Sequence, residues 1–382
     1  MFSIYVHVPF CLKKCSYCDF HSVASKPEDV PQKEFVAALC RKADIQSKKY
    51  GLEEREIGSI YLGGGTPTML SPKSLEQLLN HLSTTFKLSP EIELSIEANP
   101  ETLTRPSTAL GTCSLTYMLA HLFNRVSVGI QTFSDIQLKK LGRVHDSKTA
   151  EKAILSLQEA GCKNISIDLM WGLPGQTVDE LQDDLDRAIA LGPQHISAYQ
   201  LTTDRFSDLP SEELSREMWL LAHNKLTSAG FGHYEISNFA KMTSSNSQAH
   251  ALTHLRASPF RCRHNLNYWH YGEWLGLGPS ATGQTGNRRF TVKDDIKKYL
   301  ISDLEYTIEE IDDGTAFKEY CFMGLRTSDG IEFESFNARH PGLTEKWISK
   351  GLAQLNHSGA STFLRLTPDG WLISDTLFSV II

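Results

Sequence analysis

Six short β-rich runs recur through the first half of the chain, with 31 to 53 residues between their starts. That interval fits a strand, a crossover helix and two loops, which is the repeating unit of a parallel sheet. The runs are Ile4–Pro9, Ile57–Gly63, Ile92–Ala98, Arg125–Gln131, Asn164–Met170 and His195–Leu201. Six such units predict an α/β fold whose sheet curves into an incomplete (β/α)6 TIM-like barrel. Functional residues should then gather at the carboxyl ends of the strands.

Helix start signals lie between several of these runs. Ser71 is followed by Pro72, which indicates an N-cap and a proline in the first helical turn. Thr177 and Glu180 have the spacing of a capping box, and Asp146 can cap another helix. A longer amphipathic helix is predicted from Glu212 to Ser228.

The regular alternation of predicted strands and helices ends at about residue 210, and we expect the chain to have three parts. Residues 1–240 should form the barrel, residues 241–290 a region with a polar, loop-like insertion, and residues 291–382 a small domain of helices and a hairpin. Pro368-Asp369-Gly370 is interpreted as the hairpin turn. This α+β pattern suggests a winged-helix-like domain. Its 9 Lys and Arg against 15 Asp and Glu disfavour DNA, so we interpret it as a lid or partner surface.

Composition places the chain among globular proteins that bind neither nucleic acid nor membrane stably. Of its 382 residues 41% are apolar and 22% charged, and the formal net charge is −7. A negative balance opposes nonspecific binding to nucleic acid. No apolar run approaches the roughly 18 residues of a membrane span. The first predicted strand begins near Ile4, which leaves no room for a cleaved targeting segment, and we expect a cytoplasmic protein.

Three cysteines directly follow the first predicted strand, in the string CLKKCSYC. Cys11, Cys15 and Cys18 can converge on three irons of a 4Fe-4S cluster and leave the fourth iron open to a small molecule. A zinc site would need a fourth ligand at the usual spacing, and a disulfide framework does not suit a long chain with eight cysteines. The cluster interpretation is therefore favoured. The other cysteines, interpreted as buried small hydrophobes, are Cys40, Cys113, Cys162, Cys262 and Cys321.

Polar or glycine-rich residues follow the other predicted strands. The run Gly63-Gly64-Gly65 can present backbone N–H groups to a carboxylate, although a plain tight turn explains such a run equally well. Glu97 and Asp168 at strand ends could hold ribose hydroxyls or a cationic amine, or could simply cap the next helix. Only the combination of these features points to one site.

The cysteine spacing resembles the signature of radical S-adenosylmethionine proteins, and the chain as a whole resembles the HemW heme-chaperone family within them. The matching strings include IYVHVPFCLKKCSYCDF, YLGGGTPT, IEANPETLT, NRVSVGIQTF, LGRVHD, IDLMWGLPGQT and HNLNYW. The resemblance implies a radical S-adenosylmethionine barrel with Cys11, Cys15 and Cys18 as cluster ligands. It also implies an S-adenosylmethionine site lined by Tyr5, Gly64, Gly65, Thr66, Glu97, Gln131, Arg143 and Asp168.

The string HNLNYW matches the HNxxYW motif that the family resemblance links to heme. By this resemblance His264, Tyr268 and Trp269 are candidate heme-binding residues. Imidazole is a natural axial ligand of heme iron, and aromatic rings can cover the macrocycle. Without the resemblance, a core histidine beside a buried Tyr-Trp pair would be the simpler interpretation. Cys262 could be a second iron ligand, but no heme-attachment motif accompanies it.

Two departures separate the chain from the related oxygen-independent coproporphyrinogen III oxidase. Phe20 stands where the pattern of that enzyme has a further cysteine. That enzyme also has an N-terminal extension before its first strand, whereas only three residues precede Ile4 here. We therefore expect a heme chaperone that delivers heme to an acceptor protein and takes electrons from a donor. A radical enzyme that acts on a tetrapyrrole is the alternative, and an interaction scaffold is a third. Two longer segments, Arg105–Phe123 and Met242–Arg261, depart from the family pattern, and the second could alter access to the heme motif.

Overall fold

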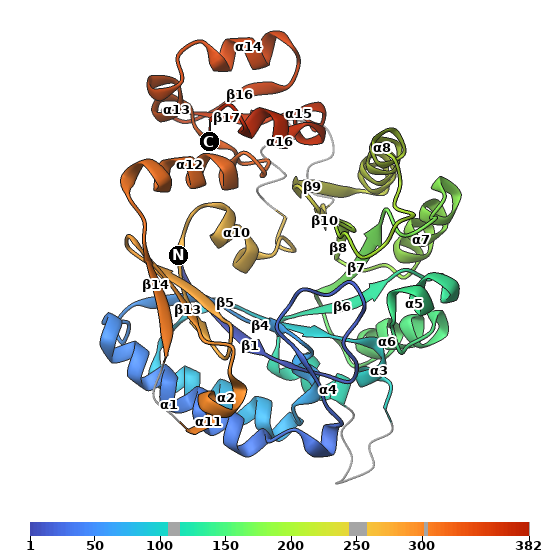
Figure 1. Ribbon diagram of the computed structural model, residues 1–382, viewed down its shortest axis with the longest axis vertical. Helices are drawn as coiled ribbons and strands as arrows, with labels where there is room; N and C mark the ends of the chain where they lie inside the picture. The colour runs from blue at the N-terminus through green and yellow to red at the C-terminus, as the bar shows by residue number, and fades with distance from the viewer. Residues whose placement is uncertain (106–114, 244–257, 302–304, 382) are drawn as a thin grey trace.

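The computed structural model describes residues 1–105, 115–243, 258–301 and 305–381 (Figure 1). Cys113, with part of the segment Arg105–Phe123 and most of the segment Met242–Arg261, lies outside the described residues.

A large curved sheet runs through the first 310 residues, and its centre is the predicted parallel array. The six predicted runs form strands β1 (Phe2–Val8), β4 (Glu56–Gly64), β5 (Lys87–Ala98), β6 (Arg125–Gln131), β7 (Ile165–Trp171) and β8 (His195–Gln200). They pair in parallel in this order, and β11 (Glu273–Leu277) adds a further parallel strand beside β1. The prediction of an incomplete α/β barrel is confirmed.

Antiparallel strands extend the sheet at both edges. Beyond β11 lie β12 (Thr282–Thr285), β13 (Arg288–Val292) and β14 (Tyr306–Glu310), and beyond β8 lie β10 (Asn238–Lys241) and β9 (Phe231–Glu235). The sheet therefore stays open between β14 and β9.

Helices cover the outer side of the parallel strands (Figure 1). They are α1 (Gln32–Tyr50), α2 (Pro72–Thr85), α3 (Pro100–Leu103), α4 (Leu115–Leu122), α5 (Asp135–Leu141), α6 (Ser147–Glu159), α7 (Val178–Ala190) and α8 (Glu212–Ser228). The predicted caps are confirmed: Ser71 accepts from the Ser74 N–H, Asp146 caps α6, and Thr177 with Glu180 forms a capping box. Each cap satisfies a backbone donor that the first helical turn leaves unpaired.

The two faces of the parallel strands differ in polarity. Ile4, Ile60, Ile96, Val128 and Ile167 belong to the main hydrophobic cluster, which the outer helices share. Because side chains alternate along a strand, the residues between them face the interior of the barrel. These interior residues are mostly polar and hydrogen-bonded to one another, and include Ser3, Ser59, Glu97, Ser127, Asp168 and His195. The barrel interior is therefore a buried polar network.

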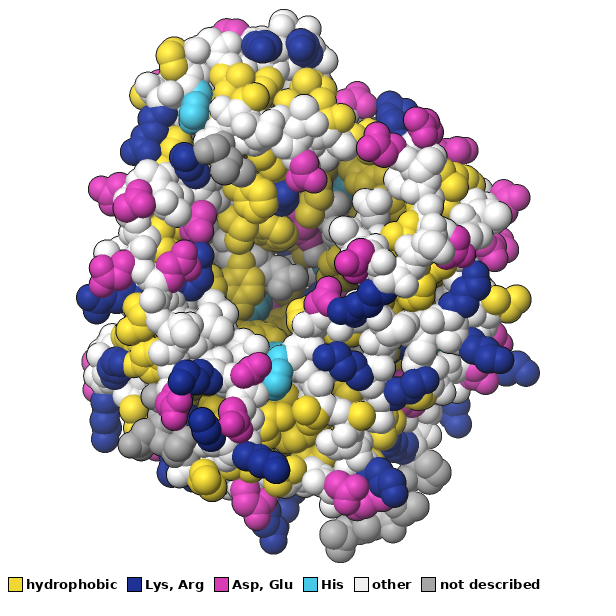
Figure 2. All heavy atoms as spheres, viewed as in Figure 1, with side chains coloured by type: hydrophobic (Ala, Val, Ile, Leu, Met, Phe, Trp, Pro, Cys, Tyr) yellow, Lys and Arg dark blue, Asp and Glu magenta, His cyan; other side chains and the backbone are white. Residues whose placement is uncertain are grey.

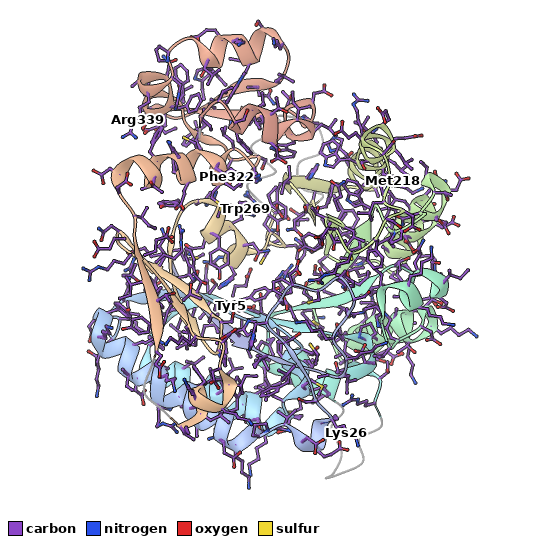
Figure 3. All side chains as sticks on the ribbon, viewed as in Figure 1. Tyr5, Lys26, Met218, Trp269, Phe322 and Arg339 are labelled. Carbon is purple, nitrogen blue, oxygen red and sulfur yellow. The ribbon has the colours of Figure 1, made fainter. Side chains whose placement is uncertain are left out.

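Helix α10 (Arg263–Trp269) lies over this interior, where it contacts β1 and β4 on one side and α12 on the other. Figure 3 places Trp269 of α10 between Tyr5 of the barrel and Phe322 of α12. The predicted HNLNYW motif is thus a short helix that connects the barrel to the C-terminal part.

The C-terminal residues form a second, smaller hydrophobic cluster around Leu325, Phe336, Trp347 and Leu364. The elements are α12 (Asp313–Gly324), β15 (Ile331–Glu332), α13 (Phe333–Arg339), α14 (Leu343–Ser349), β16 (Ala353–Ser358), β17 (Ser361–Leu366), α15 (Pro368–Leu372) and α16 (Ser374–Phe378). The preceding helix α11 (Ile296–Ile301) packs against α1 of the barrel instead. The order of elements from α12 to β17, with a three-stranded sheet β15-β17-β16, fits the expected winged-helix-like pattern.

The predicted turn of the C-terminal hairpin is wrong. The hairpin joins β16 to β17, with Ser358 paired to Ser361 across the turn. Pro368-Asp369-Gly370 instead begins α15, because Thr367 accepts from the Gly370 N–H as an N-cap and Pro368 occupies the first helical turn. A Pro in that position suits either a turn or a helix start, and the Thr cap decides for the helix.

Candidate functional site

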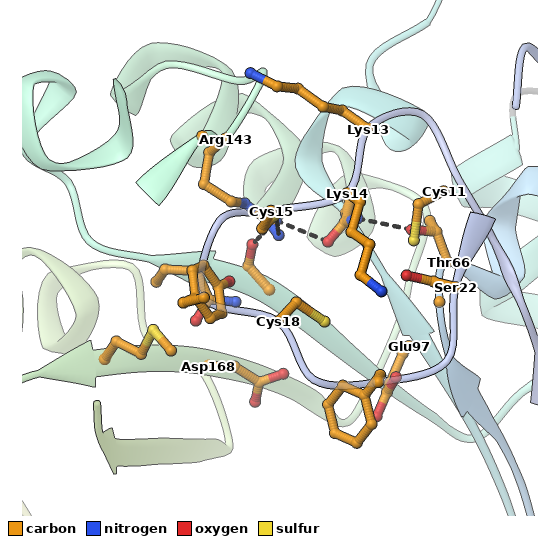
Figure 4. A pocket seen from close by; sticks show the side chains of 18 of the residues that line it. Cys11, Lys13, Lys14, Cys15, Cys18, Ser22, Thr66, Glu97, Arg143 and Asp168 are labelled. Carbon is orange, nitrogen blue, oxygen red and sulfur yellow. Dashed lines mark hydrogen bonds between the residues drawn. The ribbon is translucent and has the colours of Figure 1, made fainter. Parts of the chain in front are cut away.

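A cavity of about 610 Å³ opens at the carboxyl ends of the parallel strands. Figure 4 shows the three cysteines of the loop after β1 on one side of it and Glu97 and Asp168 on the other. The predicted site residues that line it are Cys11, Cys15, Cys18, Gly64, Gly65, Thr66, Glu97, Gln131, Arg143 and Asp168. The fold therefore brings together residues from five strands, as the strand-end pattern predicts.

The cysteine loop is fixed to the barrel through its backbone. Val23 N–H donates to the Pro9 carbonyl at 2.7 Å, and Thr66 N–H donates to the Phe10 carbonyl at 2.8 Å. Further along the loop, Ser16 N–H donates to the Leu141 carbonyl at 3.2 Å. These bonds hold both ends and the middle of the loop, so the three thiols are presented to one cavity.

Side chains from the segments that follow β4 and α5 contact two of the sulfur atoms. Thr66 Oγ1 lies 3.5 Å from Cys11 Sγ, and Arg143 Nη1 lies 3.7 Å from Cys15 Sγ (Figure 4). Asn99 connects them, because its Nδ2 donates to Thr66 Oγ1 and its Oδ1 accepts from Arg143 Nη2, both at 2.8 Å. Donors of this kind stabilise thiolates and tune a bound cluster.

Burial raises the pKa of the Cys11 and Cys18 thiols, although hydrogen bonds from Thr66 and Ser22 partly offset the effect at Cys11. Neutral thiols are therefore favoured unless a positive charge enters the loop. A metal cluster supplies that charge, since thiolate ligands bind in the deprotonated form.

The glycine run at the end of β4 leaves no room for side chains. Gly64 has φ +102°, and a Cβ there would lie 2.3 Å from His7 Nδ1. A Cβ on Gly65 would lie 2.7 Å from the Val8 carbonyl oxygen. Both positions therefore require glycine.

Glu97 and Asp168 form the carboxylate side of the cavity. Glu97 accepts from Tyr61 Oη at 2.8 Å and from the Gly64 N–H at 3.1 Å. Asp168 accepts from Ser127 and Ser166. Burial, with a contribution from the Asp168 charge, raises the pKa of Glu97 to about 7, and burial raises the pKa of Asp168. Two buried carboxylates of this kind favour a cationic or hydroxyl-bearing ligand.

Gln131 is the last residue of β6 and has φ +74°, which is rare for a residue other than glycine and is often found at functional sites. It lines the cavity as predicted. Tyr5 differs: it is not among the lining residues, and its Oη bonds to His7 Nδ1 at 3.0 Å.

Several lining residues were not predicted, and these include Tyr61, Asn99, Met170 and Tyr199. The alternation of polar and apolar residues in the strands is a signal that could have found them. Tyr61 follows Ser59 at the spacing of one face, and Tyr199 follows Ser197 in the same way.

His264 lies in the polar interior and has both ring nitrogens bonded. Nδ1 is 2.9 Å from Ser59 Oγ, and Nε2 is 2.7 Å from Tyr268 Oη. The ring is 1% exposed and stacks on Tyr61 with 5.0 Å between ring centroids. Trp269 is half-buried. In this conformation His264 offers no nitrogen to a heme iron.

Sequence comparison gives the family. The Radical SAM superfamily model matches residues 5–188. The Heme chaperone HemW of Haemophilus influenzae is 33% identical over 98% of this chain and 94% of its own length. This chain belongs to the heme chaperone HemW family. The HemW proteins of Escherichia coli and Bacillus subtilis are each 31% identical and match 99% of the chain, covering 97% and 98% of their own lengths.

The fold also matches that of a solved structure. Coproporphyrinogen III oxidase (HemN) from Escherichia coli, titled a radical SAM enzyme, superposes with a TM-score of 0.77 and 19% identity, over 100% of this chain and 89% of that structure. At this identity the similarity supports the fold alone. Among the described residues, none of the helices has the length and apolar character needed to cross a bilayer.

The radical SAM family implies a 4Fe-4S cluster and S-adenosylmethionine, and the cavity fits both. Three thiols line the cavity, and burial raises the pKa of the two carboxylates opposite them, so a cationic ligand would favour their ionised form. When bound, the cluster supplies an electron to the sulfonium. The chain itself would hold the cluster through three cysteines, hold the cofactor amine or ribose through carboxylates, and exclude water by burial.

Proposed function

We propose that this protein is a heme chaperone that carries a 4Fe-4S cluster and S-adenosylmethionine and delivers heme to an acceptor protein. The observation that carries the proposal is the cavity in which three cysteines face two buried carboxylates, in a chain that matches HemW proteins along nearly its whole length. We assign Cys11, Cys15 and Cys18 to the cluster. The remaining lining residues of the predicted set are assigned to S-adenosylmethionine.

The partners proposed are heme, an acceptor protein and an electron donor for the cluster, with the cytoplasm as the location. The division into residues 1–240, 241–290 and 291–382 stays a proposal, and the barrel sheet crosses both of its boundaries because it continues through β11 and β14. Direct contact of heme with His264, Tyr268 and Trp269 stays a prediction from the motif. Of these three residues His264 fits the prediction least well, because both of its ring nitrogens already have hydrogen-bond partners.

A test combines cluster reconstitution with heme transfer. After anaerobic reconstitution we expect about four irons per chain in the wild type and a marked loss in Cys15→Ser. Cys162→Ser is the matched control, because Cys162 is buried far from the loop in sequence and belongs to the hydrophobic cluster. Hemin-loaded protein should then transfer heme to an apo-heme protein. Failure of the reconstituted wild type to bind or release hemin would rule out the chaperone function.

The second candidate is a radical enzyme that acts on a tetrapyrrole, and the complete cofactor cavity favours it. Incubation with dithionite, S-adenosylmethionine and candidate porphyrinogens distinguishes the two. Formation of 5′-deoxyadenosine together with a decarboxylated product would support the enzyme. Hemin transfer without a modified tetrapyrrole supports the chaperone.

A further inference from the structure

The side chain of Asn99 lies between two residues that contact cysteine sulfurs, and its bonds are unusual for its place in the chain. Asn99 is the N-cap of the short helix α3, where an asparagine side chain normally accepts from the first helical turn, but here it makes no capping bond. The backbone carbonyl of Asn99 holds that turn instead, because it accepts from the Thr102 N–H at 3.0 Å and from Thr102 Oγ1 at 2.7 Å. The amide is therefore available for another role at the cysteine cavity, which it lines.

The direction of each hydrogen bond at Asn99 follows from Arg143. A guanidinium has donors and no acceptor, so the Asn99 atom that lies 2.8 Å from Arg143 Nη2 must be the oxygen Oδ1. The other amide atom is then Nδ2, which donates to Thr66 Oγ1 at 2.8 Å. A hydroxyl that accepts through its oxygen still has one hydrogen to donate, and Cys11 Sγ lies within reach of it at 3.5 Å. Thr66 therefore donates to the sulfur.

One guanidinium thus acts on two sulfurs. Its Nη1 lies 3.7 Å from Cys15 Sγ, and its Nη2 acts on Cys11 through Asn99 and Thr66. Hydrogen bonds aligned in this way polarise one another in a buried setting, and Thr66 is 2% exposed. On the surface that Figure 2 shows, Lys and Arg are mixed with Asp and Glu, and exposed charges of this kind are screened by salt. The chain of bonds through Asn99 lies beneath the surface and should act on the sulfurs at any ionic strength.

A neutral amide is the group that this position requires. Asparagine accepts from Arg143 and donates to Thr66 at the same time, whereas an aspartate has two acceptors and no donor. Facing an aspartate, the Thr66 hydroxyl would turn its hydrogen to the carboxylate and away from Cys11. The amide is also closely surrounded, since a Cβ on Gly129 would lie 3.0 Å from Asn99 Oδ1.

We propose that Asn99 is a positioning residue for the cluster, because it sets the direction in which Thr66 donates and so places a hydrogen bond on Cys11. The proposal rests on the cluster assignment of the proposed function and adds to it a residue that acts on a sulfur through another side chain. Hydrogen bonds to cluster sulfurs stabilise the more negative, reduced cluster and so raise its reduction potential. Asn99 therefore makes the cluster easier to reduce, and the reduced cluster is the form that supplies an electron.

The reduction potential of the anaerobically reconstituted full chain tests the proposal, through a double-mutant cycle of Asn99→Asp and Thr66→Val. Thr66→Val removes the hydroxyl and should lower the potential by about 59 mV, which is a tenfold change in the one-electron equilibrium. That is the order expected when a hydrogen bond to a charged group is lost. In the Asn99→Asp background the hydroxyl already donates elsewhere, so Thr66→Val should change the potential much less. The charge added by Asn99→Asp is present in both proteins of this second comparison and cancels.

Controls separate this proposal from the function on which it rests. Asn80→Asp adds the same charge on the exposed side of α2 and should leave the potential at the wild-type value. If Asn99→Asp holds no cluster, Asn99→Ala replaces it in the cycle, and the effect of Thr66→Val should again shrink because the hydroxyl is no longer oriented. Equal effects of Thr66→Val in the two backgrounds, or no effect in either, would overturn the role of Asn99. A wild-type chain that binds no iron would instead remove the cluster assignment itself.

Discussion

Arg143 adds a side-chain link between the cysteine loop and the barrel strands. One guanidinium contacts Cys15 Sγ, the Asn99 side chain and, at 2.6 Å, the Gly129 carbonyl. These contacts hold the planar guanidinium of Arg143 in one orientation.

Arg143→Lys keeps the charge but cannot make these three contacts at once. We expect the variant to fold, to bind a cluster, and to lose iron to a chelator about 10- to 100-fold more readily than the wild type. Iron release under anaerobic conditions measures the effect. Arg288→Lys, on an exposed pair with Glu310, should release iron at the wild-type rate. Equal release by both variants would show that Arg143 does not support the cluster.

Glu97 should make the binding of S-adenosylmethionine depend on pH near neutrality. Burial raises its pKa to about 7, so the carboxyl is protonated below that pH and ionised above it. A cationic amine binds only the ionised form well. S-adenosylmethionine affinity of the reconstituted protein should therefore rise between about pH 6 and pH 8.

Glu97→Gln should remove that rise and give an affinity near the low-pH value of the wild type. Equilibrium dialysis at several pH values is the measurement. The variant preserves the shape of the side chain and an acceptor for Tyr61. A wild-type affinity that is flat over this range would exclude Glu97 as the group that receives the cation.

At the scale of elements, α10 is held by its buried histidine. His264→Ala leaves Tyr268 Oη and Ser59 Oγ without this partner and removes the ring that stacks on Tyr61. Lost packing and lost hydrogen bonds together should lower the free energy of unfolding by about 2 to 4 kcal/mol. Denaturant unfolding provides the test, and Tyr268→Phe should cost only about 1 kcal/mol. A stability of His264→Ala equal to that of the wild type would mean that the ring does not fix the helix.

The elements themselves show which features local sequence can predict. Caps such as Ser71 and Thr177 act within four residues, so the sequence contains the whole interaction. The cysteine loop and the strand-end carboxylates were also predictable, because strand topology brings them to one edge. Pro368-Asp369-Gly370 misled because the same residues suit a turn and a helix start. The burial of His264 in the barrel interior depends on which side of α10 faces the barrel, and that is decided by long-range packing.

At the scale of the whole molecule, aromatic rings and histidines join the barrel to the C-terminal cluster. The His233 ring stacks on Phe239 of the barrel edge with 3.9 Å between centroids, and lies 4.7 Å from Trp371 of the C-terminal cluster. His233 Nδ1 is 2.8 Å from His223 Nδ1. Protonation of His233 is unfavourable here, because burial and the neighbouring His223 charge lower the pKa of His233 to about 3.

This junction should weaken in acid. Between pH 6.5 and the folded pKa of about 3, the unfolded chain binds a proton at His233 that the folded chain does not, so stability falls as the pH falls. From pH 6.5 to pH 4.5 one such group contributes a loss of about 2 kcal/mol. Glu235 nearby has its pKa raised by burial to about 8 and acts in the opposite direction, and a comparison of variants cancels its effect. His233→Gln should therefore lose about 2 kcal/mol less than the wild type over this interval in denaturant unfolding. Equal losses in the two proteins would show that the junction does not respond to His233, and His357→Ala serves as the control because that ring is exposed.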